Sequence, residues 1–225
     1  MGEEAQGAGG QVAGSGEGQA AGSGGSAGAQ AAEGAPRRRR ADAQRNVDAL
    51  LKAARAVFDT SGVDAPAKEI ADLAGVGVGT LYRHFPLRSD LVKAVVETGI
   101  DACAAAGPRL SAVHEPGDAL AEWLRQYTAF LGTKRGLAPA LHSGDPAYAG
   151  LSGYFHEKLG PALAALLDAA AEGGEARGDV EAHELLYAIA NLCVPVPGGG
   201  PEYNQRMVGL LIDGLRQPGA GGGPR

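Results

Sequence analysis

The apolar residues of this chain recur at the spacing of an α-helix, and this spacing limits the folds open to it. The clearest case is a set of side chains that share one face of a helix: Val47, Leu50, Leu51, Ala54, Val57 and Phe58. They predict a helix from about Asp42 to Thr60, ended by Gly62. No stretch alternates apolar and polar residues as a half-buried strand does. The sequence therefore predicts an all-α fold.

The same spacing continues through the middle of the chain, interrupted by glycine and proline. In chain order, further helices are expected over about 66–74, 78–84, 91–106, 120–131, 147–171, 185–192 and 202–215. Pro161 is expected to bend or split the helix over 147–171, since proline removes a backbone donor. With short pieces between Gly136 and Pro146, the prediction is about nine helices.

Glycine is concentrated at the two ends of the chain, where it argues against a fold. Residues 1–36 contain no Lys, Arg or aromatic residue, and their apolar side chains larger than alanine are Met1 and Val12. Such a segment cannot bury enough surface to offset the entropy of ordering it. We therefore expect disorder over 1–40, a tail that ends in the run Arg37 to Arg40, and again over 217–225.

The sequence also favours a cytoplasmic protein without membrane contact. Its first residues have neither the basic start nor the apolar core of a signal peptide, and no apolar run reaches membrane-spanning length. Two cysteines, Cys103 and Cys193, make no disulfide framework, and we expect both to be buried thiols.

Charge is distributed unevenly along the chain. Residues 37–93 carry eleven bases and seven acids, whereas residues 1–36 carry four acids and no base, and residues 94–225 carry nine bases and fifteen acids. The net charge of -6 argues against a protein that coats nucleic acid indiscriminately. A single basic block on an acidic chain indicates one module that faces a polyanion.

Two short predicted helices lie within this basic block and are joined by Gly75-Val76-Gly77. They fit a helix-turn-helix, in which the second helix enters the major groove of DNA and the first braces it. In the second helix Leu81 and Phe85 share a face suited to burial, and Thr80, Tyr82, Arg83 and His84 lie on the other. Tyr82 and His84 could instead pack on the next helix.

Several motifs follow one another at fixed spacings through the same region. They are Ile70-Ala71, Ala74-Gly75-Val76, Gly79-Thr80-Leu81-Tyr82-Arg83-His84-Phe85 and Arg88-Ser89-Asp90-Leu91. Together they closely resemble the DNA-binding signature of the TetR/AcrR family of bacterial regulators, over about Asn46 to Val96. The glycine-rich turn and Arg88 look most like the SbtR-like branch.

This resemblance implies a domain organisation and a set of DNA contacts. It implies a helix-turn-helix domain over 41–92, of three helices, and a C-terminal domain over 93–216 that begins with a long linking helix, holds an effector and forms a homodimer. By position, it places Lys68, Val78, Gly79 and Thr80 near base edges, and Tyr82, His84 and Arg88 on phosphates. Arg83 joins these candidates because it lies on the same polar helix face.

The chain departs from the family pattern at two places. Many members have Thr or Ser where this chain has Ala65-Pro66-Ala67, which leaves a phosphate contact there in doubt. Gly77 and Val78 leave few side chains for direct base readout, so methyl contacts or DNA shape would supply the specificity. The run Arg37 to Arg40 is either a solvated charge run or an arm that follows the DNA.

The sequence carries no catalytic or metal-binding constellation. His156-Glu157 and His183-Glu184 begin like a zinc-binding H-E-x-x-H motif, but Gly160 and Tyr187 stand where the second His should be. Gly75 to Gly79 is glycine-rich, but no strand precedes it and Thr80 follows, so it is not a dinucleotide loop. We expect neither an enzyme nor a cofactor.

The C-terminal region offers candidates for an effector pocket and for a dimer interface. The pocket candidates are aromatic or polar residues on apolar stripes, although core packing is the simpler role for each: Trp123, Tyr127, Phe130, His142, Tyr154 and Phe155. The dimer candidates lie on the last two helices, which resemble the family's dimer elements: Leu185, Leu186, Ile189, Val208, Leu211 and Ile212.

These observations favour a dimeric repressor that a small molecule releases from a palindromic operator. A ligand-independent repressor or an activator remains open, and so does an all-helical protein-interaction module whose basic segment is incidental.

Overall fold

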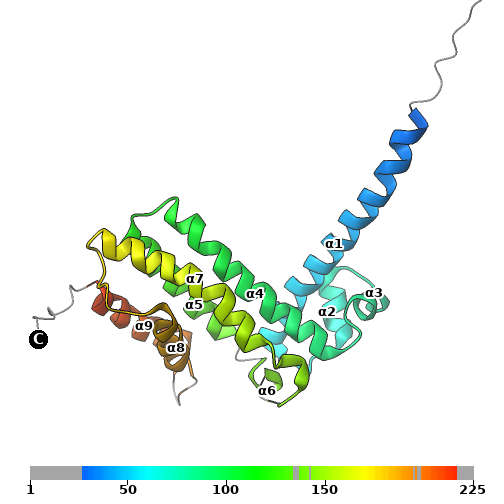
Figure 1. Cartoon of the computed structure of the whole chain (residues 1–225). Helices are drawn as coiled ribbons and strands as arrows, with labels where there is room; N and C mark the ends of the chain where they lie inside the picture. The colour runs from blue at the N-terminus through cyan, green and yellow to red at the C-terminus, as the bar shows by residue number, and fades with distance from the viewer. Residues whose placement is uncertain (1–26, 134–136, 142, 195, 197–198, 217–225) are drawn as a thin grey trace, which may run out of the picture. The chain divides into compact units, whose positions relative to one another are not determined.

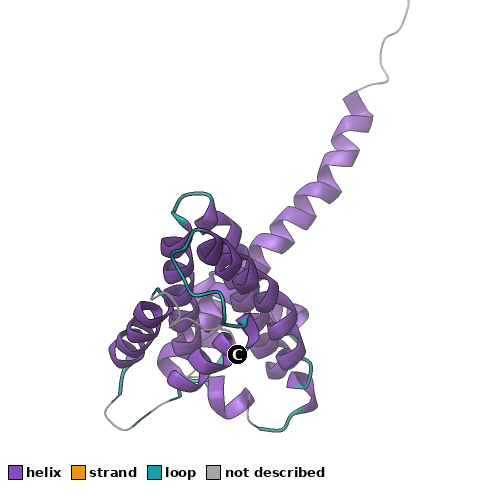
Figure 2. Cartoon of the chain, turned by 60° about the vertical axis from the view of Figure 1, so that its left-hand side comes forward, coloured by secondary structure: helices purple, strands orange, loops and turns teal. Residues whose placement is uncertain are grey.

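A computed structural model describes residues 27–133, 137–141, 143–194, 196 and 199–216 of the chain. These residues form helices and connecting loops, with no strand among them (Figures 1 and 2), which confirms the all-α prediction. The helices are α1 (Ala27–Ser61), α2 (Ala67–Ala74), α3 (Val78–His84), α4 (Arg88–Ser111), α5 (Pro116–Thr133), α6 (Ala138–Leu141), α7 (Leu151–Glu172), α8 (Ala182–Leu192) and α9 (Pro201–Leu215). A 3-10 helix, η2, covers Pro146–Tyr148.

The chain divides into two compact units, Met1–Asp42 and Ala43–Arg225, and the candidate sites lie in the second. Helix α1 begins at Ala27, earlier than the predicted start near Asp42. The expectation of disorder up to residue 40 therefore does not match the backbone of residues 27–40, where alanine and arginine both favour helix. Residues 1–26 and 217–225 of the predicted tails, and the side chains of Arg37 to Arg40, lie outside the described residues.

The C-terminal half of α1 packs with α2 and α3 around an apolar core. Leu50, Val57 and Phe58 are buried on α1, as the helical spacing predicts, and they join the core that includes Ile70 of α2 and Leu81 of α3. The basic block thus folds into a small helical module around its own apolar centre.

Helix α4 continues from this module into the C-terminal helices. Its start is capped by Asp90, whose carboxylate accepts a hydrogen bond from the backbone N–H of Leu87 at 3.0 Å. The predicted end near Ala106 is wrong, because α4 runs to Ser111. Pro108 lies in the last turn and does not end the helix, and Gly107 is buried against Ala162 of α7.

Helices α4, α5 and α7 pack against one another, α9 packs on α5, and α8 packs on both α7 and α9 (Figure 1). Pro161 is exposed and lies inside α7, which is assigned as one helix and is not split. The core between these helices includes Trp123, Leu163 and Leu186, and both cysteines are buried in it as expected.

Candidate nucleic-acid interface and ligand cavity

The turn between α2 and α3 has a backbone geometry that favours glycine. Gly75 has a φ of 71°, in the left-handed region, and its N–H donates to the carbonyl oxygen of Asp72 at 3.2 Å. The N–H of Val76 donates to the carbonyl oxygen of Ala71 at 3.0 Å. These bonds end α2 and allow α3 to begin at Val78.

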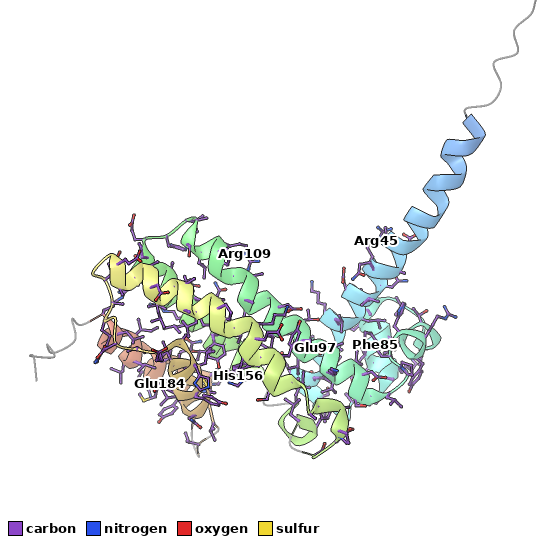
Figure 3. All side chains as sticks on the ribbon, in the orientation of Figure 1. Arg45, Phe85, Glu97, Arg109, His156 and Glu184 are labelled. Carbon is purple, nitrogen blue, oxygen red and sulfur yellow. The ribbon has the colours of Figure 1, made fainter. Side chains whose placement is uncertain are left out.

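One face of α3 is buried and the other faces outward. Leu81 and Phe85 are buried, as predicted, and Figure 3 labels Phe85. Tyr82 is 54% exposed and Arg83 is also exposed. The remaining predicted DNA contacts on α3 are the exposed Gly79 and the half-buried Val78, Thr80 and His84. The outward face therefore offers hydroxyl, guanidinium and imidazole groups that can bond to phosphate oxygens.

Lys68 and Arg88 differ in how far they remain available to DNA. Lys68 is exposed on α2, and its Nζ lies 2.5 Å from Oδ2 of Asp72, a surface ion pair that is easily exchanged. The guanidinium of Arg88 donates a hydrogen bond to the carbonyl oxygen of Ala65 and lies 5.7 Å from the centroid of the Phe58 ring. Arg88 thus has a structural role that the sequence did not indicate, and its phosphate contact stays a prediction.

Two of the predicted pocket residues are part of the core. Trp123 and Tyr127 are fully buried and stacked, with ring centroids 5.5 Å apart. Nε1 of Trp123 donates to the carbonyl oxygen of Cys103 at 2.9 Å. The Tyr127 hydroxyl donates to the carbonyl oxygen of Leu186 at 3.1 Å. Burial raises the pKa of Tyr127 well above its usual range. Both side chains therefore join helices together, with their polar atoms already bonded.

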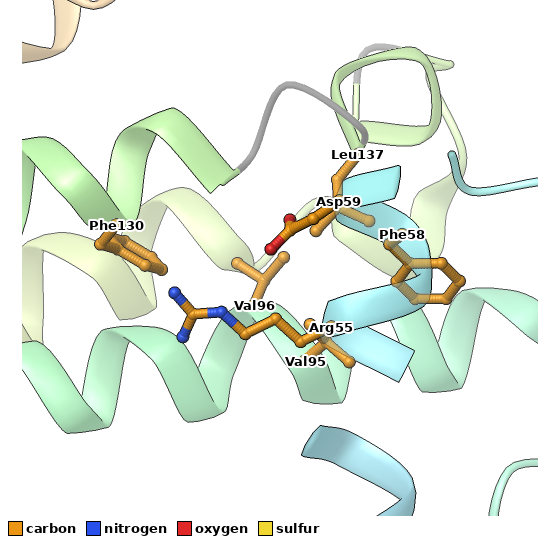
Figure 4. Close-up of a pocket in the computed structure, with 7 residues that line it drawn as sticks. All are labelled: Arg55, Phe58, Asp59, Val95, Val96, Phe130 and Leu137. Atoms are coloured by element: carbon orange, nitrogen blue, oxygen red, sulfur yellow. The ribbon is translucent and has the colours of Figure 1, made fainter. Parts of the chain in front are cut away.

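Phe130 lies where α1 approaches α4 and α5 (Figure 4). It borders a gap of about 10 Å³, barely enough for one water molecule, so this point is a packed joint. Arg55 extends from α1 toward the Phe130 ring, near Asp59. Burial raises the pKa of Asp59, and the charge of Arg55 opposes that shift. The joint connects the helix-turn-helix to the C-terminal helices.

Tyr154 and His142 do not contribute to a described cavity. The Tyr154 hydroxyl donates to Oδ1 of Asp101 at 2.6 Å, which raises the pKa of Tyr154 to about 12 and links α7 to α4. His142 lies outside the described residues.

Phe155 is the predicted pocket residue that lines a sizeable cavity. This cavity, of about 440 Å³, lies among α4, α7, α8, α6 and η2. Its lining residues are Val96, Ile100, Leu141, Tyr148, Leu151, Ser152, Phe155, His156, Tyr187 and Ala190. Sequence reasoning missed His156 and Tyr187, because it considered them only as parts of incomplete zinc motifs. Their helical spacing gave no sign that α7 and α8 bring them together.

His156 is the most distinctive polar group of this cavity. Its Nδ1 lies 2.7 Å from the carbonyl oxygen of Ser152, and its Nε2 is buried without a hydrogen-bond partner within the described structure. The rings of Tyr187 and His183 lie beside it, at centroid distances of 5.0 and 5.5 Å. In Figure 3, His156 is labelled close to α8.

The predicted dimer residues mostly face the protomer's own core. Leu185, Leu186, Ile189, Val208 and Ile212 are buried within the protomer and Leu211 is half-buried, and their place in a dimer interface stays a prediction. The spacing of these residues identified an apolar stripe, but the helices α5 and α7 already cover it. The exposed apolar side chains of the two helices are Tyr187, Leu192 and Leu210.

Two further findings concern metals and membranes. Within the described ranges, no three His, Cys, Asp or Glu side chains gather in a group that could hold a metal ion. No described helix combines the length and the apolar character needed to cross a membrane.

Two family models match separate parts of the chain. Residues 50–95 match the model of bacterial regulatory proteins of the tetR family. Residues 115–217 match the C-terminal domain of SbtR-like transcriptional regulators.

Known transcriptional regulators are similar to this chain in sequence and structure. A TetR transcriptional regulator of Streptomyces coelicolor is 36% identical, with a TM-score of 0.66 over 77% of this chain and 99% of its own. A TetR regulatory protein of Mycobacterium vanbaalenii is 35% identical, with a TM-score of 0.61 over 79% of this chain and 99% of its own. An HTH-type transcriptional regulator of Staphylococcus aureus is 40% identical over 63 residues, which are 28% of this chain and only 34% of that protein. The chain therefore belongs to the TetR family of DNA-binding transcriptional regulators, a family of non-enzymes, and has an SbtR-like C-terminal domain.

Proposed function

We propose that this regulator is a homodimeric repressor that binds a palindromic operator and is released by a small molecule in the cavity among α4, α7 and α8. The observation that carries the proposal is the division of α3, in which Leu81 and Phe85 are buried while Tyr82 and Arg83 face outward. A recognition helix needs such a division, because its inner face must be held while its outer face enters the groove. Its place of action is the cytoplasm, where its DNA target lies.

The distribution of charge along the chain also supports DNA binding by the region that contains α3. The block 37–93 carries a net +4, from eleven bases and seven acids, whereas residues 94–225 carry a net -6. A DNA duplex would be attracted to the first region and repelled by the second. This asymmetry favours one orientation of the protein on DNA.

The dimer would form through the outward faces of α8 and α9. These helices pack together and expose Tyr187, Leu192 and Leu210, and Val194 is exposed directly after α8. Exposed apolar side chains of this kind are available to an interface with another copy. A two-fold dimer would present two α3 helices to half-sites about 34 Å apart.

The effector would act through α4. Val96 and Ile100 of this helix line the cavity, and Arg88 in its first turn is bonded to the helix-turn-helix. A ligand that fits one position of α4 better than another would shift the population toward that position. If the favoured position separates the two α3 helices from their half-sites, the operator is released.

The test begins with selection of the genomic fragments that the full-length protein retains. Fluorescence anisotropy then compares the selected fragment with a scrambled duplex of equal length, at about 0.15 M salt. Specific recognition predicts a preference of roughly a thousandfold or more. Equal affinity for both duplexes would refute operator recognition, and a monomer bound at a single half-site would refute the dimer.

A further inference from the structure

The volume of the α4–α7–α8 cavity limits the size of its ligand. The cavity measures about 440 Å³, within the range of small-molecule sites. A water molecule occupies about 30 Å³ of liquid, so the space suits a molecule of on the order of fifteen non-hydrogen atoms. This is the size of a compound with two fused rings and a few substituents.

The lining of the cavity disfavours a charged ligand. None of the ten described residues that line it is Asp, Glu, Lys or Arg. An ion bound there would meet no opposite charge among these residues to offset the water that it lost. The polar groups that the lining offers are the Ser152 hydroxyl, the His156 ring and the phenols of Tyr148 and Tyr187.

Aromatic side chains give the cavity flat apolar walls. Phe155, Tyr148 and Tyr187 come from α7, η2 and α8. Phe155 is supported from the core by Tyr127, with ring centroids 6.0 Å apart, so its position is well defined. Such rings favour a ligand that itself contains a ring.

His156 indicates which hydrogen bond the ligand would make. A carbonyl oxygen only accepts, so the 2.7 Å contact with Ser152 places a proton on Nδ1. Nε2 of the neutral imidazole is then an acceptor, and it is buried without a partner within the described structure. A buried acceptor left unsatisfied is costly, and a ligand that displaces a neighbouring side chain from Nε2 and donates to it would remove that cost.

We propose that the cavity binds an uncharged, ring-containing molecule of this size that donates a hydrogen bond from a hydroxyl or N–H group to Nε2 of His156. The inference rests on the proposed function, because it names the chemical class of the effector. It adds a specific polar contact and disfavours anionic and cationic effectors.

Three bicyclic probes of nearly equal shape test this class: β-naphthol, its methyl ether and β-naphthoate. The first can donate, the second cannot, and the third is an anion at neutral pH. Titration calorimetry with the full-length protein and no DNA should show naphthol binding about tenfold more tightly than the ether, the value of one well-formed hydrogen bond. Naphthoate should bind most weakly.

Two variants locate the hydrogen bond. His156→Phe should abolish the difference between naphthol and its ether, because no acceptor remains. His183→Phe is the matched control, since it removes a neighbouring imidazole that does not line the cavity, and it should keep the difference. Thermal unfolding checks that both variants are folded. If either is not, the comparison of the three probes on the unaltered protein still tests the hydrogen bond.

Each contrary result overturns a stated part of the proposal. Equal binding of naphthol and its ether refutes the donor contact, tighter binding of naphthoate refutes the uncharged class, and no binding of any probe refutes the ligand class. Anisotropy of the operator complex is measured in parallel. If naphthol binds but leaves the complex intact, the ligand class stands and release by naphthol fails. If the operator binds but no probe does, operator recognition stands and the ligand class fails.

Discussion

The guanidinium of Arg88, in the first turn of α4, donates a hydrogen bond to the backbone carbonyl oxygen of Ala65, just before α2. The same guanidinium lies over the Phe58 ring of α1. One side chain therefore connects the helix that borders the ligand cavity with α1 and with the loop between α1 and α2. A displacement of α4 would be passed to the DNA-binding helices through this connection.

Replacing Arg88 with alanine should destabilise the protein as well as weaken its DNA binding. Loss of the charged hydrogen bond and of the ring contact is expected to lower the free energy of unfolding by about 1 to 2 kcal/mol. Chemical denaturation measures this change. If Arg88 acted only on phosphates, Arg88→Ala would leave the unfolding curve unchanged and Arg88→Lys would retain most of the DNA affinity.

Replacing Arg83 with alanine should weaken binding to all duplexes alike. Arg83 is exposed on α3, and loss of one phosphate contact should reduce the slope of log affinity against log salt by about 0.9. Arg109→Ala is the matched control, because Arg109 is equally a surface arginine but lies in the last turn of α4, distant from α3 (Figure 3). Anisotropy at several salt concentrations compares them, and equal slopes would remove Arg83 from the interface.

Replacing Leu210 with arginine should yield monomers. Leu210 is 63% exposed on α9, so the change would leave the protomer core intact while placing a charge in the proposed interface. Val113→Arg is the control, since Val113 is 73% exposed just beyond α4. Light scattering reports the mass of each variant. A persistent Leu210→Arg dimer would move the interface away from this face.

Replacing Gly99 with alanine should destabilise the packing of α4 on α5. A Cβ atom at Gly99 would lie 2.9 Å from Cδ2 of the buried Phe130 ring, so the ring would have to move, at a cost of about 1 to 3 kcal/mol. Gly132→Ala should instead be neutral or slightly stabilising, because nothing lies within 4 Å of a Cβ there. Thermal unfolding compares the two variants. If Gly99→Ala melts at the same temperature as the unaltered protein, the Phe130 ring can move at little cost.

Replacing Ala190 with phenylalanine should close the ligand cavity. Ala190 lines the cavity from α8, so a ring at this position would occupy space that the ligand needs and reduce naphthol affinity at least about tenfold. Ala105→Phe, on an exposed position of α4, serves as the control. Calorimetry measures binding, and undiminished affinity in the Ala190 variant would place the ligand elsewhere.

The helix-turn-helix could be predicted from the sequence because its signals are local. Gly75 marks a left-handed residue, and the spacing of Leu81 and Phe85 marks the buried face of α3, so the order and type of the elements followed from neighbouring residues. The start of α1 and the end of α4 were wrong, because no single residue at Asp42 or Gly107 was enough to stop a helix. The DNA contacts of α3 stay predictions.

The C-terminal domain shows what periodicity determines and what only packing decides. The sequence by itself determined that α8 and α9 carry apolar stripes and that Trp123 and Tyr127 lie on one. Spacing along a helix cannot say which neighbour covers a stripe, so only the tertiary structure turned Ile212 inward and left Leu210 exposed. A cavity is likewise formed by several helices together, and His156 came to face Tyr187 because α7 and α8 pack side by side.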